Sequence, residues 1–386
     1  MDIWNKVRWA KEASDLKIDL SSGAEITRLS GSSLHTCNNY LAGSCSAEGD
    51  RCLGVRLADM LLKRPCALLA HDLSSKHTAL LEEHCATFEQ VPIPFTGIIY
   101  YINDRQELCR VSLDTFQREV IMSMLGLPPL ADVLRAVTPD GRYAFCPTIT
   151  TNPAGLTLGI VRIDLLEKEW KIIFESSGFH GLQYLGGIDA LLIGQRTLPD
   201  GSMPPMGIWS NGPNLSYEVL LIRTDGTLIR KLGAPFGYMT WLSETGQVVC
   251  NCKYDTQRWR QLPERPAGNM VIFNSLNRDN PRVIEAPDHL FFHIARSKCG
   301  KYVVSEAYRA GVGINGPVDI VVVNIRSGKH RVLVSDCGVR PDGAAWRQAC
   351  PYMTSSGKFV VYNANPYDIT HIYAARIPDG FWESLE

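Results

Sequence analysis

The sequence predicts an all-β fold, a seven-bladed β-propeller in which an N-terminal strand closes the last blade. The first observation is a tight-turn signal before an aromatic or β-branched run, which recurs at residues 139–143, 244–249, 299–304 and 356–362. The second is an apolar strand, a turn and an alternating strand, as at residues 163–173 and 323–333. Short strands with such turns, repeating about every 40–50 residues, are typical of propeller blades.

Length and composition limit the class of protein. A chain of 386 residues could form one large domain or two ordinary ones. Because each blade packs only on its neighbours, the repeat favours a single propeller domain over residues 1–386. A hydrophobic content of 45% is typical of globular proteins. A net charge of −1 without a basic block argues against a nucleic-acid partner.

The N-terminus and the cysteines indicate the compartment. Residues 1–20 carry charges throughout and lack the apolar core of a signal peptide. No stretch is long and apolar enough to predict a membrane span. The 12 cysteines form no spacing framework, so we expect buried free thiols in a reducing compartment. These features predict a cytoplasmic protein, with secretion left open if a leader has been removed.

The blades follow in order along the chain. Residues 2–16 read as an amphipathic helix, so we expect residues 1–20 to form an N-terminal helix or arm. The blades occupy residues 24–377, and residues 378–386 form a tail. The individual blades are expected at residues 34–83, 84–123, 131–177, 178–233, 236–287, 288–338 and 345–377. Blade seven is one strand short, and the isolated strand at 24–29 would supply its outer strand and remove an open edge.

Two long insertions interrupt blades four and five. Residues 197–217 are rich in Gly, Pro and Met, and residues 253–269 are rich in Arg, Gln and Pro. Long loops on a rigid scaffold commonly shape a binding site. We expect these two insertions to wall the mouth of the propeller channel.

Polar residues recur at one position in the blades. The innermost strand of each blade lines the central channel, so the residue about six to ten positions before each hairpin glycine points into a shared mouth. A purely structural mouth would more often carry small or apolar residues, and this set indicates a functional site. The set comprises Asn39, Arg135, His180, Tyr238, His293, Arg347, Gln348 and Cys350, with Gln90 or, less well, His84 in blade two.

These residue types favour one chemistry. Arginine suits bidentate recognition of a carboxylate, and histidine and tyrosine can move protons. The set contains no paired Asp or Glu, which disfavours a two-carboxylate glycoside hydrolase, and the chain has no Gly-x-Ser-x-Gly elbow. Carboxylate recognition with a His/Tyr proton shuttle fits β-elimination from a uronic acid.

Several stretches carry a resemblance to a known family. Residues 25–29 are similar to a Val-Thr-Arg-Leu opening, residues 38–40 to Arg-Asn-Tyr, and residues 179–184 to Gly-His-Pro-Gln-Tyr. Residues 355–362, followed by Ile372 and Tyr373, resemble the end of the last blade. In this order and spacing, over nearly the whole chain, they resemble the seven-bladed propeller polysaccharide lyases, and oligogalacturonate lyase in particular.

The departures from that family matter for the mechanism. The family's catalytic base position is Tyr238 in this chain. The family binds a manganese-like ion through a blade-six histidine, matched by His293, and through a Gln/His cluster in blade seven. That cluster reads Gln-Ala-Cys-Pro-Tyr here, at residues 348–352. One imidazole and one amide hold a hard divalent ion poorly, so we expect no cofactor, and a divalent ion stays an alternative whose family ligands are largely missing.

The resemblance therefore implies a lyase acting on an acidic oligosaccharide or polysaccharide, with no nucleic-acid or membrane partner. Loss of the metal cluster points to relatives that act on glucuronate, in ulvan or in rhamnosyl-glucuronate caps. The implied catalytic residues are Tyr238 and His180 as proton-transfer pair, in either order, Arg135 on the carboxylate, and His293 as supporting ligand or second proton carrier. Asn39, Arg347 and Gln348 would bind sugar hydroxyls. Exo action follows if the insertions wall a pocket.

Two other classes stay open. A non-catalytic propeller would serve as a binding platform and would show an exposed patch without an organised pocket. A hydrolase or epimerase could use the same mouth, because a fold does not determine a function.

Overall fold

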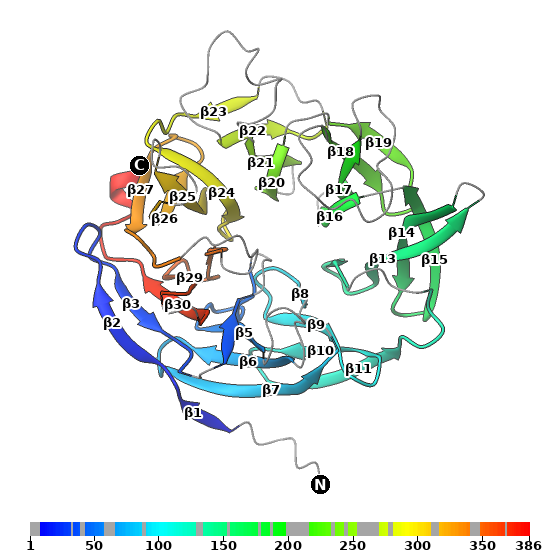
Figure 1. Cartoon of the computed structure of the whole chain (residues 1–386), viewed down its shortest axis with the longest axis horizontal. Coiled ribbons are helices and arrows are strands. Elements are labelled where there is room, and N and C mark those ends of the chain that lie inside the picture. The colour runs from blue at the N-terminus through cyan, green and yellow to red at the C-terminus, as the bar shows by residue number, and fades with distance from the viewer. Residues whose placement is uncertain are drawn as a thin grey trace.

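Thirty β-strands and one short 3-10 helix, Glu383–Leu385, make up the regular structure of the described residues, which contain no α-helix. The computed structural model describes residues 8–31, 34–38, 43–57, 66–86, 90–128, 134–152, 155–176, 179–185, 188–197, 216–232, 236–242, 246–252, 270–276, 281–309, 316–339, 348–366 and 369–386. The strands form seven antiparallel sheets, five of four strands and two of five. The sheets stand side by side in a closed ring (Figure 1). The fold is therefore a seven-bladed β-propeller.

Each blade is a meander of consecutive strands. Blade one consists of β4 (His35–Cys37), β5 (Arg51–Leu57), β6 (Cys66–Asp72) and β7 (His77–Cys85), with β1 (Trp9–Lys11) outside it. Blade two consists of β8 (Val91–Pro92), β9 (Ile98–Ile102), β10 (Glu107–Ser112) and β11 (Arg118–Ser123). Blade three consists of β12 (Ala136–Val137), β13 (Tyr143–Asn152), β14 (Gly155–Asp164) and β15 (Glu169–Ser176). Blade four consists of β16 (Phe179–Leu185), β17 (Ala190–Thr197), β18 (Ser216–Arg223) and β19 (Leu228–Lys231).

The last three blades follow the same plan. Blade five consists of β20 (Phe236–Trp241), β21 (Gln247–Cys252), β22 (Met270–Asn274) and β23 (Arg282–Ile284). Blade six consists of β24 (His289–Arg296), β25 (Tyr302–Arg309), β26 (Val318–Asn324) and β27 (His330–Val334). Blade seven consists of β28 (Tyr352–Met353), β29 (Phe359–Ala364) and β30 (His371–Arg376), extended by β3 (Glu25–Arg28) and β2 (Ser14–Ile18). The first strands of neighbouring blades contact one another, as β20 with β24 and β24 with β28, and so form the inner ring.

The predicted closure of blade seven is confirmed. Strand β3 pairs antiparallel with β30, with Ile26 opposite Ala375 and Thr27 opposite Ala374. Both ends of the chain therefore contribute to one sheet, which removes the open edge of β30. Ile26 is 2% exposed within this sheet. Figure 1 shows β2 and β3 lying beside β30 at the edge of the ring.

The predicted N-terminal helix is wrong where the structure describes it. Residues 9–11 form β1, which pairs with β7 of blade one, and residues 14–18 form β2, which pairs with β3 of blade seven. Glu12, between the two strands, lies 2.5 Å from the Arg56 guanidinium of blade one. The outer strands of blades one and seven each offer an edge with unpaired backbone groups. Hydrogen bonds to these edges stabilise residues 9–18 as strands more than their weak helical periodicity stabilises a helix.

Hydrophobic clusters lie between neighbouring blades, and this packing closes the ring. One cluster joins Ile102 of blade two to Val161 of blade three, and another joins Leu221 of blade four to Val248 of blade five. The cysteines belong to these cores: of the described thiols all are free, and only Cys299 is exposed. No helix in the described ranges is long and apolar enough to cross a membrane. Most of the predicted insertions, residues 198–215 and 253–269, lies outside the described residues.

Candidate functional site

The inner ring brings two of the predicted residues together. Tyr238 lies in β20 of blade five and His293 in β24 of blade six. Their ring centroids are 4.0 Å apart, with the planes tilted by 53°. Tyr238 is half-buried and His293 is 8% exposed. Two residues that can exchange protons are therefore in direct contact at the inner strands.

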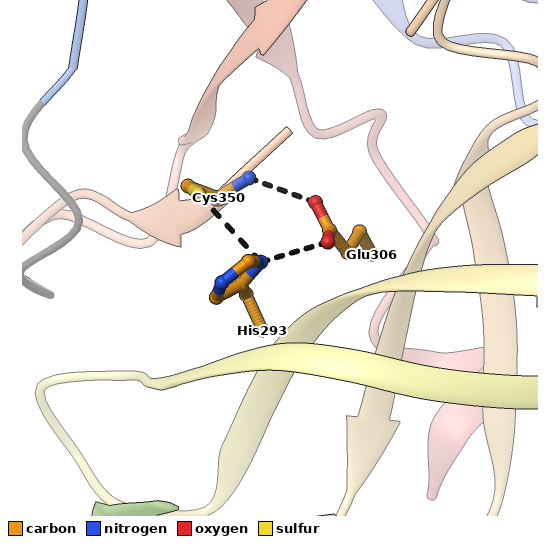
Figure 2. Close-up of side chains that lie close together, drawn as sticks. All are labelled: His293, Glu306 and Cys350. Carbon is orange, nitrogen blue, oxygen red and sulfur yellow. Dashed lines mark hydrogen bonds and ion pairs between the residues drawn. The ribbon is translucent and has the colours of Figure 1, made fainter. Parts of the chain in front are cut away.

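A buried carboxylate holds the other side of His293. Glu306 Oε1 lies 2.7 Å from His293 Nδ1, and Glu306 Oε2 accepts a 3.0 Å hydrogen bond from the backbone N–H of Cys350. Cys350 Sγ also lies on this side of the imidazole, 3.6 Å from Nδ1. Figure 2 shows the three side chains converging, with the second ring nitrogen of His293 turned away from Glu306. The site joins β24 and β25 of blade six to the segment before β28 of blade seven.

A β-bulge sets the orientation of His293. The register between β24 and β25 shifts between Phe291 and Ile294, so that Phe292 and His293 fall outside the regular pairing. The Asn251 side-chain amide from blade five donates to the carbonyls of Phe291 (3.2 Å) and Phe292 (3.1 Å). Bulges of this kind redirect side chains and are frequent beside active sites. The bulge turns His293 towards Glu306 in the neighbouring strand.

The backbone of Cys350 is held by hydrogen bonds from two other blades. Its φ of 43° is in the left-handed region, which is uncommon for a residue other than glycine. The Glu306 carboxylate accepts its N–H, and its carbonyl accepts a 2.9 Å hydrogen bond from Asn38 Nδ2 of blade one. Asn363 in β29 bonds to Asn38 in both directions, at 2.7 and 2.8 Å. Blades one, six and seven therefore meet at this point, and the contacts hold an uncommon backbone conformation.

The geometry excludes Cys350 as a nucleophile activated by His293. Burial, and next the negative charge of Glu306, hold the pKa of the Cys350 thiol well above its usual range. A nucleophilic relay would place the thiol and the carboxylate on opposite ring nitrogens. Here both face Nδ1. Cys350 is therefore a packing neighbour of the histidine and remains a neutral thiol.

His293, Glu306 and Cys350 are also the group of described side chains whose donor atoms converge closely enough to hold a metal, all within 4.8 Å. The donor chemistry does not fit a hard ion such as manganese. Glu306 Oε2 already accepts a hydrogen bond from the Cys350 backbone, and the third donor is a soft sulfur. Hard divalent ions take oxygen and imidazole ligands. We therefore derive no step through a metal.

The other predicted residues are placed as follows. Arg135 precedes β12 of blade three and is half-buried. Burial raises the pKa of the Cys146 thiol, and the positive charge of Arg135 opposes this rise. Gln348 precedes β28, and its carbonyl accepts from Asn363 Nδ2 at 3.4 Å. His180 lies in β16 opposite Gly194, but its side chain is outside the described part. Asn39 and Arg347 also lie outside the described residues. The contacts described above thus support Tyr238 and His293 as one site and leave the roles of the other residues as predictions.

Sequence reasoning missed Glu306. It lies in the second strand of its blade, whereas the repeat pattern marks only positions at the inner strands. A signal was present, because residues 302–308 contain one acidic residue in an otherwise uncharged, mostly apolar strand. A carboxylate in such a strand is rarely buried without a partner. Glu306 is 0% exposed, accepts a hydrogen bond from the Cys350 backbone N–H, and shares a second hydrogen bond with His293 Nδ1.

The fold and the site define a seven-bladed β-propeller in which Tyr238 and His293 meet on inner strands and Glu306 contacts His293 from the second strand of blade six. No protein-family model matches the chain. No curated protein matches it either. Among solved structures it is similar to an oligogalacturonate lyase in complex with manganese, at 18% identity and a TM-score of 0.69, over 98% of this chain and 99% of that one.

A second oligogalacturonate lyase, from Vibrio parahaemolyticus, aligns at 15% identity and a TM-score of 0.70, over 97% of this chain and all of the other. The acylaminoacyl peptidase of Pyrococcus horikoshii aligns at 12% identity and a TM-score of 0.53, over 87% of this chain and 52% of the peptidase. At such identities the likeness shows the fold. The alignment with the two lyases spans the whole propeller, and that with the peptidase covers about half of the enzyme.

Proposed function

We propose that the protein is a lyase that cleaves a 4-linked uronic acid in an acidic glycan by β-elimination. The observation that carries this proposal is the contact of Tyr238 with His293, at 4.0 Å between ring centroids, on the inner strands of a lyase-like propeller. Elimination needs a base for the proton α to the carboxylate and an acid for the leaving oxygen. A tyrosine beside a histidine can supply both.

The remaining parts of the reaction fall to predicted residues. Arg135 would neutralise the uronate carboxylate, since the guanidinium group matches a carboxylate in bidentate geometry, and Arg347 would bind sugar hydroxyls. His180 stays a candidate for proton transfer with Tyr238. Asn39 and Gln348 would bind sugar hydroxyls. We favour glucuronate over galacturonate, and exo action, because the family's metal cluster is altered and long insertions connect the second and third strands of blades four and five.

The direct test measures formation of the new C4–C5 double bond. Conjugated with the carboxylate, this bond absorbs in the ultraviolet, so absorbance is followed with oligogalacturonate, ulvan, gum arabic and glucuronoxylan. A rise on one substrate establishes β-elimination. Release of reducing ends without a rise would indicate a hydrolase instead. Neither signal on any substrate would contradict a catalytic role and favour a binding platform.

The role of Tyr238 is tested by substitution. Tyr238→Phe keeps the ring packing on His293 and removes only the hydroxyl. We expect turnover to fall by roughly 10²–10⁴-fold, which is typical for loss of a general acid or base. Tyr302→Phe is the matched control, because the Tyr302 hydroxyl bonds to Glu386 near the C-terminus. Unchanged turnover in Tyr238→Phe would contradict the assignment of Tyr238 to proton transfer.

The absence of a metal step is tested with chelators. Because the donor set at His293 does not fit a hard ion, the initial rate should be the same before and after dialysis against a strong chelator. Addition of manganese should not raise it. A rate that falls on dialysis and returns with manganese would show that metal chemistry takes part.

A further inference from the structure

We propose that strand β15, the outer strand of blade three, is the interface of a two-fold homodimer. In this dimer β15 of one copy pairs antiparallel with β15 of a second copy, and the pairing is centred on Trp170. The four strands of blade three in each copy then form one continuous sheet. This inference goes beyond the proposed lyase function and does not depend on it, because the interface lies on the outer strand and the candidate site on inner strands.

The outer edge of β15 has no strand beside it among the described residues. Blade three has the order β12-β13-β14-β15, so β15 pairs with β14 on one side only. Figure 1 shows β15 at the outer rim of the ring. The N–H and C=O groups on the free side of an edge strand can pair with a strand of another chain. With eight residues, Glu169–Ser176, β15 offers a long edge for such pairing.

Most other blades have outer edges that are covered, short or interrupted, which are the usual ways of avoiding association. Strand β1 pairs with the outer strand of blade one. Strand β2 extends blade seven and contains a bulge at Asp15–Lys17. The outer strands of blades four and five have four and three residues. On blade six, Arg331 of β27 donates a 3.1 Å hydrogen bond to Ser384 in the 3-10 helix.

The outer strand of blade two, β11, is the remaining comparison. Its six residues include Val120, which is 50% exposed. The charges of β11 are already paired within the chain, Arg118 with Glu82 at 2.7 Å and Glu119 with Arg110 at 2.6 Å. Strand β11 therefore offers apolar surface but no charge that lacks an opposite charge.

Apolar side chains are exposed along β15. Trp170 is 43% exposed and Ile172 is 39% exposed, and Leu166 in the preceding turn is 71% exposed. Trp170 lies opposite Ile163 of β14 and Ile172 opposite Val161, so both side chains are on one face of the sheet. Pairing two copies about Trp170 places the two indole rings side by side. Removal of this apolar surface from water favours the dimer.

The charges on the other face of β15 have no opposite charge beside them in the blade. Glu169 lies opposite Asp164 and Lys171 opposite Arg162, so each has a like charge across the strand pair. Like charges directly opposite each other destabilise a sheet. Among the described residues, no ion pair joins Glu169 or Lys171 to another side chain. Lys171 has only a longer-range attraction to Asp225 of blade four.

A two-fold axis at Trp170 supplies the missing opposite charges. In this register Glu169 of each copy lies opposite Lys171 of the other, so the interface has two complementary pairs. Residues 169–172 pair regularly with β14, and the bulge of β15 follows Ile172. Cross-strand pairs of opposite charge stabilise a sheet, and the same pairs fix this register. A symmetric contact of this kind occupies the free edge of both copies, so association stops at the dimer.

The first experiment determines the mass of the full chain in solution by analytical ultracentrifugation over a range of protein concentrations. We expect a monomer–dimer equilibrium that stops at the dimer and weakens at high salt, because exposed charges are screened. A protein that stays monomeric at every concentration would overturn the proposal. Growth into larger assemblies would also overturn it, because a closed two-fold contact leaves no free edge.

The second experiment changes the charges. Glu169→Lys and Lys171→Glu each place like charges at both contacts, so the dissociation constant of the dimer should rise about tenfold or more. Mixed in equal amounts, the two variants should form a heterodimer, because every lysine of one then lies opposite a glutamate of the other. Within blade three both substitutions replace a like-charge pair by an opposite-charge pair, so both variants should fold.

The matched control is Lys17→Glu, which changes an exposed charge on the outer edge of blade seven and should leave the dimer as in the wild-type protein. A dimer that persists unchanged in both single variants would show that the copies meet through another surface. Failure of the mixture to associate would overturn the two-fold register. Glycan cleavage is measured separately, so loss of the lyase proposal leaves this test intact, and a monomeric protein that cleaves a uronate glycan would overturn only the dimer.

Discussion

Among the described residues, buried histidines contact either a hydroxyl group or a carboxylate. His71 lies 1% exposed in β6, where Nδ1 is 2.8 Å from the Thr78 hydroxyl. Burial, and next the charge of Arg56, lower the pKa of His71 to about 3. Burial likewise lowers the pKa of His371, in β30, to about 4. A histidine paired with a hydroxyl in a core stays neutral, whereas His293 has a carboxylate beside it.

The two neutral histidines predict acid sensitivity. Their pKa values in the folded protein lie below the ordinary 6.5, so the unfolded chain binds more protons between pH 6.5 and about 4. Folding free energy should therefore be lost as the pH falls through this window, by up to about 1.4 kcal/mol per pH unit for each histidine. Urea unfolding at pH 7, 6, 5 and 4 measures the loss. His71→Gln should flatten the slope, and an unchanged slope would contradict the assignment to His71.

Only part of the candidate site could be predicted from the sequence, and the reason is physical. Tyr238 and His293 could be predicted because both sit on inner strands at equivalent places in the repeat. Glu306 and the backbone of Cys350 join them through a β-bulge and through pairing between strands and blades. Such contacts depend on register, which a hydrophobic pattern alone does not specify.

At the scale of elements, the blades and the closing strand could be predicted and the first two strands could not. The turn signals mark where hairpins begin, and the missing strand of blade seven leaves one place for residues 25–28. Residues 9–18 carry apolar positions that fit a helix about as well as a strand. These residues form strands because the edges of β7 and β3 offer backbone hydrogen bonds to them. A segment that packs outside a finished blade takes its conformation from that blade.

The closing hairpin offers a matched pair of isoleucines for a stability test. Ile26 in β3 is 2% exposed, and Ile18 in β2 is 59% exposed. We expect Ile26→Ala to lower the free energy of unfolding by about 2–5 kcal/mol, because it leaves a cavity in the core of blade seven. Ile18→Ala should change it by less than about 0.5 kcal/mol. Chemical denaturation of both variants measures the difference, and equal losses would show that β3 is not packed as described.

For the molecule as a whole, the ring has one place where its two ends are joined. The core cluster at this joint combines Leu29 of the N-terminal segment with Tyr302 of blade six and Val361 of blade seven. The site lies close to the joint, since Cys350 of blade seven bonds both to Asn38 of blade one and to Glu306 of blade six. Closure of the ring and assembly of the site therefore depend on the same contacts.

This dependence predicts the effect of opening the ring. Deletion of residues 1–29 removes β1, β2 and β3 and exposes the edge of β30, so the thermal midpoint should fall and the protein should associate through the free edge. The proposed lyase activity should fall with it, because blade seven no longer holds Cys350 against Glu306 of blade six. A synthetic peptide of residues 8–31 should bind the opened propeller as a strand and restore part of both stability and activity. Calorimetry, size-exclusion chromatography and the double-bond assay measure these effects. A truncated protein as stable as the full chain and in the same oligomeric state would show that the ring closes without its N-terminal strand.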